Sequence, residues 1–301
     1  MPLRSQQHVD TLLSNISVKY VPNGLIAMDV FPEVPVKKDS DLYRVYTQNF
    51  RIPETKRANK GLAREHQFEV TTSSYVLERH ALKDYISDND VDNYDIADLR
   101  ADTTEELTEK IMLRVEKSVA DLMTTSSWSL GVSLAAAAAF TQNTTVSNPI
   151  PVFDTAATTI LNNGGFQPNF GIIPRAAFVA IKNHTSVLDR TKYTSADMTP
   201  EMLKGLFDLK EILIANGAYD TAAQGATSSI SSIWASHCFV GYKPERAGPL
   251  KPSSGYLFRK STPMVRRWRV EERQAEAIEV EMQYVPKVVA SLSGYLIKGT
   301  T

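Results

Sequence analysis

A long amphipathic stretch, residues 92–123, constrains the fold of this chain more than any other feature of the sequence. Its apolar side chains recur at steps of three and four, with one gap of eight, as on one stripe of an α-helix: Ile96, Leu99, Leu107, Ile111, Val115, Val119 and Leu122. The opposite face is charged, and Glu106 precedes Lys110 by the four residues that support a helix. About 30 residues at a rise of roughly 1.5 Å each make a rod of about 45 Å. A rod of this length indicates a scaffold for something extended.

Two residues inside this stretch bear on where the helix begins. Thr103 and Glu106 have the spacing of a capping box, in which the two side chains close the first turn of a helix. The helix therefore either begins near Thr103 or runs through it from residue 92, and both alternatives stay open at this point.

The length and composition are those of a globular protein. The chain has 301 residues, which suggests two domains or one elaborated domain, and 43% hydrophobic with 22% charged residues argues against wholesale disorder. The longest apolar run, residues 130–140, is shorter than the roughly 18 residues that cross a bilayer. The segment MPLRSQQHVD at the amino terminus lacks the apolar core of a signal peptide. We therefore expect neither a membrane partner nor export.

Charge and cysteine usage narrow the class of protein further. Lys plus Arg number 33 and Asp plus Glu 34, so the net charge of -1 lacks the excess of a dedicated nucleic-acid-binding protein. The one cysteine, Cys238, cannot form an internal disulfide, which fits folding in a reducing cytoplasm. Any contact with DNA is expected to be weak.

Two alternating runs near the amino terminus predict a long β-hairpin. Residues 42–52 and 68–78 are rich in β-branched and aromatic side chains, and a polar, basic connection separates them. This connection forms a charged tip with Lys56, Arg57, Lys60 and Arg64. Such a charge run is usually a solvated turn, but a basic tip on a long arm also suits contact with acidic groups of an adjacent subunit, and we predict that intersubunit contact. A two-stranded hairpin is marginally stable in water, so we expect this one to lie on a surface, either of this chain or of another subunit.

The remainder of the chain predicts a mixed α/β region followed by antiparallel strands. Helices are expected from Asp154 to the Gly164-Gly165 pair and after Pro174 and Pro200. Strands are expected at 170–174, 211–215 and 233–242, with a loop at 216–232, and then at 264–270, 277–285 and 287–298. The predicted class is therefore α+β, with an α/β subdomain in the middle and a helix-plus-sheet subdomain built from both sides of it.

The sequence offers little for catalysis. Common nucleotide, zinc and redox motifs are absent, and no two of the five histidines have the helical spacing of metal ligands: His8, His66, His80, His184 and His237. His237 and Cys238 are adjacent, but neighbouring residues on a strand point to opposite faces, so we interpret Cys238 as a small buried hydrophobe. We expect no enzyme activity, no metal and no cofactor.

The best candidate for a nucleic-acid contact lies at 265–273. Arg266, Arg267 and Arg269 flank Trp268, a pattern suited to phosphates and bases. Glu271 and Glu272 follow at once and weaken that interpretation. Ion pairs between neighbouring subunits are therefore favoured over DNA contact for the three arginines.

The order of these elements resembles the major capsid protein of tailed bacteriophages, with the HK97-type fold. Four stretches carry the resemblance: 30–58, the helix around 106–123, 166–190, and 233–245 followed by GYLFR at 255–259. The resemblance implies an N-terminal arm at 1–36, an extended two-stranded loop at 37–82, a peripheral domain with a long spine helix at 83–148, an axial α/β domain at 149–252, and closing strands at 253–301 that return to the peripheral and axial domains.

The resemblance also implies a function. It predicts a structural subunit that assembles into an icosahedral or prolate virus head enclosing double-stranded DNA. An encapsulin-like shell around enzyme cargo is the alternative, and a soluble hydrolase is a remote one. The implied partners are further copies in hexamers and pentamers, a portal, a separate scaffolding protein, a candidate cement protein, and packaged DNA through weak contact. Because the chain begins almost directly with the arm, scaffolding is expected to come from a separate protein. The expected location is the virion, after assembly in the bacterial host cytoplasm.

Overall fold

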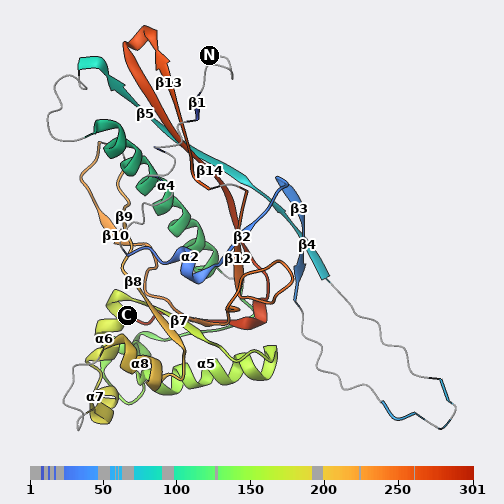
Figure 1. The fold of residues 1–301 in the computed structure, drawn as a ribbon. Helices are drawn as coiled ribbons and strands as arrows, with labels where there is room; N and C mark the ends of the chain where they lie inside the picture. The colour runs from blue at the N-terminus through green and yellow to red at the C-terminus, as the bar shows by residue number, and fades with distance from the viewer. Residues whose placement is uncertain are drawn as a thin grey trace.

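The computed structural model describes most of the chain. The described residues are 8–9, 13, 17, 24–46, 55–57, 59, 61–62, 71–89, 98–125, 128–191, 199–223, 225–260 and 262–301. Two sheets and one long helix dominate the architecture, and a hairpin extends from one side (Figure 1).

The long helix, α4 (Leu99–Thr124), confirms the amphipathic prediction over most of its length. The side chain of Asp98 accepts a hydrogen bond from the Arg100 amide at 3.1 Å and caps the helix. Thr103 instead donates its hydroxyl to the Leu99 carbonyl at 2.7 Å, so the interpretation of Thr103 as a second start is wrong. Ile96 and the rest of 92–97 lie outside the described residues.

A six-stranded sheet packs against one face of α4. Its strand order is β1-β13-β14-β12-β2, with β5 also paired to β14. The strands are β1 (His8–Val9), β2 (Glu33–Pro35), β5 (Glu78–Ser87), β12 (Gly255–Arg259), β13 (Met264–Val270) and β14 (Ala275–Val288). Alternate residues of β14, Ile278, Val280 and Met282, are fully buried in one core with the apolar stripe of α4. We call α4 and this sheet the long-helix lobe.

A five-stranded sheet forms the second layer, the central lobe. Its order is β6-β15-β11-β7-β8, with strands β6 (Leu130–Ser133), β7 (Phe170–Pro174), β8 (Glu211–Ala215), β11 (Cys238–Gly241) and β15 (Gly294–Lys298). One face, with Phe170 and Phe239, joins the core of the long-helix lobe. The other face, with Cys238 and Val240, is covered by α5 (Pro149–Gly164) and α6 (Arg175–Lys182). Two short helices, α7 (Thr185–Thr191) and α8 (Pro200–Leu206), complete this lobe.

The predicted strands at 170–174, 211–215 and 264–270 are confirmed residue for residue. The helix predicted from Asp154 begins earlier, because Asn148 accepts a hydrogen bond from the Ile150 amide at 3.1 Å and Pro149 fits the first helical turn. The helices predicted after Pro174 and Pro200 are present as α6 and α8.

Three predictions for the carboxyl-terminal half are wrong in part. Of residues 233–242 only β11 is a strand, because Ile233 and the three residues after it form a turn. The loop predicted at 216–232 contains a small hairpin, β9 (Ala218–Asp220) with β10 (Ile230–Ser232). Residues 287–298 are not one strand, since β14 ends at Val288 and β15 enters the five-stranded sheet.

The predicted domain boundaries stay a prediction. Strand β6 comes from the segment assigned to the peripheral domain, yet it pairs with β15 in the central lobe. Among the described residues, no helix has both the length and the apolarity that a bilayer-spanning helix needs.

Candidate intersubunit surfaces

The base of the hairpin packs against the long-helix lobe through three aromatic side chains, Tyr43, Tyr75 and Phe258, which we call the aromatic seat. Its strands β3 (Ser40–Val45) and β4 (Thr71–Val76) pair antiparallel, and they cover part of the two predicted runs; residues 47–54 and 63–70 lie outside the described residues. One face turns Tyr43 and Tyr75 onto Phe258 of β12, with ring centroids 5.4 and 4.8 Å apart. The Tyr46 amide also donates to the Val289 carbonyl at 3.1 Å. These contacts fasten the base of the hairpin to the long-helix lobe.

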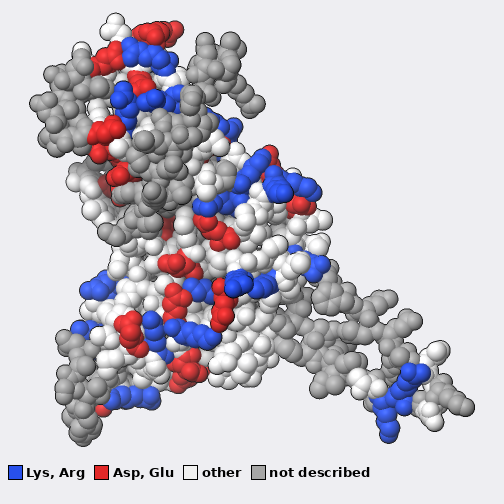
Figure 2. Space-filling model, viewed as in Figure 1, with Lys and Arg blue, Asp and Glu red and all other residues white. Residues whose placement is uncertain are grey.

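Beyond its base the hairpin leaves the body of the protein. The described residues near its tip, 55–57, 59 and 61–62, stand well away from both sheets (Figure 1). Lys56 and Arg57 are exposed there, and Figure 2 shows basic side chains gathered at this end. Arg57 donates its Nε–H to the Gly61 carbonyl, which is a local contact within the tip. Lys60 and Arg64, which are also predicted to contact an adjacent subunit, lie outside the described residues.

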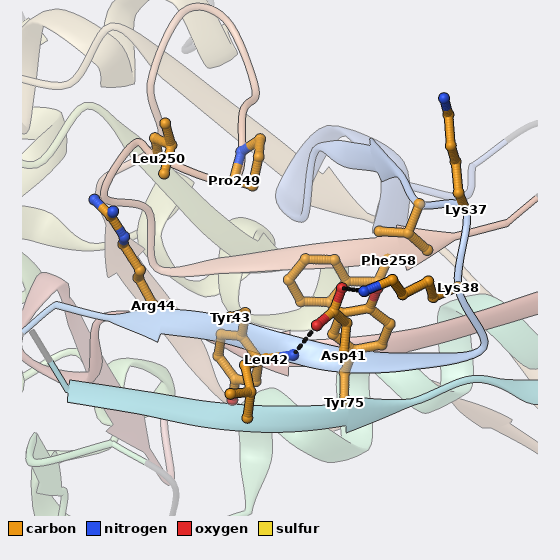
Figure 3. A pocket seen from close by; sticks show the side chains of 11 residues that line it. Lys37, Lys38, Asp41, Leu42, Tyr43, Arg44, Tyr75, Pro249, Leu250 and Phe258 are labelled. Carbon is orange, nitrogen blue, oxygen red and sulfur yellow. Dashed lines mark hydrogen bonds and ion pairs between the residues drawn. The ribbon is translucent and has the colours of Figure 1, made fainter.

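The hairpin base borders a groove of about 330 Å³, which is lined by residues of both faces of β3 and by Pro249 and Leu250 (Figure 3). Because side chains alternate along a strand, Leu42 points away from the aromatic seat and is 65% exposed. Leu250, from the loop across the groove, is also 65% exposed. A hydrogen bond from the Leu42 amide, together with Lys38, holds the pKa of Asp41 below its ordinary value. The groove is therefore apolar, with charged side chains at its rim.

The three arginines of β13 make ion pairs within the chain. Arg266 lies 2.6 Å from Glu281 and 3.3 Å from Glu279, and Arg267 lies 3.2 Å from Glu276. Arg269 pairs with Asp88, and this hydrogen bond raises the pKa of Arg269. Each arginine thus has an intrachain carboxylate, and the predicted roles in subunit contact or DNA contact stay predictions.

Glu281 is the most buried carboxylate of this network, at 5% exposure. Burial pulls its pKa upward, but hydrogen bonds from Arg79 and Gln283 and the charge of Arg266 outweigh burial, so the pKa is lowered. The ion-pair network therefore needs an ionised Glu281, so the protonation of Glu281 is linked to the stability of the sheet.

Two titratable side chains outside these surfaces, Cys238 and His184, are held by burial and by hydrogen bonds within the central lobe. Cys238 is fully buried, as predicted, and burial raises its pKa to about 12. His184 accepts a hydrogen bond from the Ser186 amide at Nδ1, so Nε2 carries the proton that it donates to Ser147 Oγ at 3.1 Å. A histidine in this tautomer cannot take the proton of Ser147 at Nε2. Within the described ranges, no three potential metal ligands gather at one place.

Sequence reasoning missed two features that matter here. The groove beside the hairpin was signalled only by Leu42, whose phase in the alternating run places it opposite Tyr43. Glu116 was missed as well, although it lies on the buried side of α4 and is fully buried. The charged residue at an inward helical position was the signal for it.

Comparison with known proteins connects this architecture to virus shells. The chain is 27% identical to a major capsid protein of Burkholderia phage BcepMu, over 97% of this chain and 96% of that protein. It is 26% identical to a major capsid protein of Pseudomonas phage JBD67, over 79% of this chain and 78% of that protein. No protein-family model matches the chain.

Solved structures support the same fold. A phage-related protein from Bordetella bronchiseptica RB50 superposes with a TM-score of 0.78 at 24% identity and covers 98% of both chains. The mature capsid of bacteriophage PhiM1 has a TM-score of 0.61 at 7% identity, over 93% of this chain and 88% of that one. The virus-like particle of Pyrococcus furiosus has a TM-score of 0.56 at 10% identity, over 95% of this chain and 96% of that one. The chain is thus similar in sequence, over most of its length, to major capsid proteins of phages and has the HK97-type fold, which supports a structural capsid subunit.

Proposed function

We propose that the chain assembles with further copies of itself, as hexamers and pentamers, into the closed icosahedral or prolate head that encloses double-stranded phage DNA. The hairpin carries this proposal. Its base is fastened by Phe258, while its basic tip stands beyond any surface of its own subunit (Figures 1 and 2). A tip in this position reaches an adjacent copy, and Lys56, Arg57, Lys60 and Arg64 supply cations for acidic groups there.

The remaining partners follow from this role. A portal, a separate scaffolding protein and a cement protein are proposed partners, and assembly takes place in the cytoplasm of the bacterial host. Packaged DNA contacts the shell weakly, because the net charge is -1 and Arg266, Arg267 and Arg269 already have carboxylate partners.

The proposal is tested by reversing the charge of the tip. In the variant Lys56→Glu, Arg57→Glu, Lys60→Glu, the melting temperature of the unassembled subunit should not change measurably, because exposed substitutions usually alter stability by about 0.5 kcal/mol or less. The yield of intact particles on a density gradient should fall strongly, since a repulsive contact is repeated at every subunit.

The matched control keeps the charge and changes the side chains. Lys56→Arg, Arg57→Lys, Lys60→Arg should assemble like the wild type if charge is what the tip contributes. Normal particle yield from the Glu variant would show that the tip is only a solvated turn.

An encapsulin-like shell with enzyme cargo is the second candidate, and a virus-like particle from Pyrococcus furiosus shows that the fold also occurs in such particles. The phage relatives by sequence favour the viral head. Electron microscopy of purified particles separates the two: large heads containing DNA support the first candidate, and small uniform shells containing protein support the second.

A further inference from the structure

A one-turn helix, α2 (Ala27–Val30), lies at the junction of the two lobes (Figure 1). Ala27, Val30 and the adjacent Phe31 are buried in the core that the two lobes share. The Phe31 ring occupies the space above Gly255 of β12, where an added Cβ would lie 2.3 Å from the ring. A helix of four residues has no stability of its own, so the contacts of α2 decide its conformation.

The beginning of α2 is held by the long-helix lobe. Glu116, in the middle of α4, is fully buried and accepts hydrogen bonds from the amides of Ile26 at 3.0 Å and Ala27 at 2.7 Å. Its second oxygen accepts the indole N–H of Trp234, from the turn that follows β10. One carboxylate therefore joins α4 to two segments that are 90 and 118 residues away in the chain.

The end of α2 is held by the central lobe. The Lys243 ammonium donates to the Asp29 carbonyl at 2.7 Å and pairs with Glu211 of β8 at 2.7 Å. The Lys243 backbone is fixed by Asn169, which accepts from its amide at 2.9 Å and donates to its carbonyl at 2.6 Å. The two ends of α2 are thus attached to different lobes by charged side chains.

The burial of the Glu116 carboxylate, which disfavours its charged form, argues that this residue has a geometric role. Burial raises its pKa, and the hydrogen bonds from Trp234 and from the two amides do not outweigh that effect. Replacing a buried ionic group by apolar side chains of similar volume is often neutral or stabilising, so we infer that Glu116 is retained for the arrangement that it specifies. The arrangement it specifies is the position of α2 against α4.

We propose that α2 is a clip that sets the angle between the two lobes and, through that angle, the curvature of the shell. The second part rests on the proposed function, whereas the first concerns the subunit alone. Because α2 connects the two lobes only when both of its ends are attached, loss of either attachment breaks the connection.

Two variants open the clip at opposite ends. Glu116→Gln removes the charge from the first end with little change in shape, and Lys243→Met removes the ammonium at the second end. The controls are Glu106→Gln, on the exposed face of the same helix, and Glu211→Gln, which removes the charge of the other partner of Lys243 and keeps the bond to Asp29.

Hydrogen exchange and small-angle scattering of the unassembled subunit test the clip. Each variant should speed amide exchange at 26–31 by about tenfold or more, because local opening governs exchange, while α4 and β7 exchange as in the wild type. The scattering curves should show a wider range of subunit shapes, and electron microscopy should show particles of mixed diameter. The controls should match the wild type in all three measurements.

The double variant decides between a clip and two independent contacts. If α2 acts as a clip, the double variant should show a shape distribution no broader than that of either single variant. Additive broadening in the double variant would overturn the proposal. Exchange and scattering equal to the controls would also overturn it. If Glu116→Gln fails to fold, Lys243→Met decides alone, because it leaves α4 unchanged. If the wild type forms no shell, the proposed function fails, while exchange and scattering still test the clip.

Discussion

The hairpin tip and strand β13 carry similar basic residues but place them in opposite surroundings. On β13, Arg266 stands opposite Glu279 of β14, and Arg269 stands opposite Glu276, so carboxylates lie within reach across the sheet. At the tip, Arg57 contacts the neutral carbonyl of Gly61 and no strand of the two sheets lies alongside. The difference shows that cross-strand neighbours decide whether a cation is paired with a carboxylate of its own sheet.

The largest effect is expected where the hairpin meets the body. Phe258→Ala removes a side chain that is 2% exposed and contacts both hairpin tyrosines, so we expect a loss of about 3–5 kcal/mol in the free energy of unfolding. Amide exchange at 40–45 and 71–76 should rise above that of β13 and β14. Denaturant unfolding and hydrogen exchange measure the two effects.

Phe153→Ala is the control for this variant, because Phe153 is 1% exposed and stacks on Phe207 in the central lobe. It should cost a similar amount and leave hairpin exchange unchanged relative to the sheets. Equal exchange of the hairpin in both variants would mean that Phe258 is not its seat.

The second effect concerns the arginines of the sheet. Arg266→Ala leaves the buried Glu281 with one arginine fewer, and we expect the unassembled subunit to lose about 1–3 kcal/mol. Arg269→Ala, on the same strand but in an exposed pair with Asp88, should lower the melting temperature less. Comparable melting of the two variants would contradict the distinction between a buried and an exposed partner.

A third, smaller effect should appear on acidification. The pKa of Glu281 is lowered in the folded state, so its contribution is present above the ordinary glutamate value of about 4.3 and is lost as the pH falls through the folded pKa. The stability gap between the wild type and Glu281→Gln should therefore narrow as the pH falls below that value. Melting curves from pH 7 down to acid measure it, and a constant gap would argue against the network.

The smallest effect is expected on the outer face of the hairpin. Leu42→Ser should change the stability of the unassembled subunit by no more than about 0.5 kcal/mol, because this side chain is 65% exposed. Val76→Ser is the matched control, since Val76 is 63% exposed and does not line the groove. A clear drop in melting temperature for Leu42→Ser alone would show that the groove is packed within the subunit.

Local patterns in the sequence determined much of this protein. Apolar periodicity predicted α4, short apolar runs predicted the strands at 170–174 and 211–215, and alternation predicted the strand at 264–270. Element order indicated the capsid fold that the relatives support. These features were accessible because each depends on residues that are close together in the chain. The start of α5 was misplaced at Asp154 although the signal was local, because Pro149 fits a first helical turn.

Only the tertiary structure decided which charges are buried, paired or presented. Arg266 and Glu281 are close in sequence, but Arg79, which shares that carboxylate, is 202 residues from it. Glu116 meets partners 90 and 118 residues away, and β15 enters the five-stranded sheet although its neighbour β14 belongs to the other. Apolar periodicity indicates which face of a helix or strand is buried, but it carries no information about which distant segment covers that face. That choice is made by packing the whole chain, and it assigned Glu116 to α2 and left the basic tip of the hairpin outside the body.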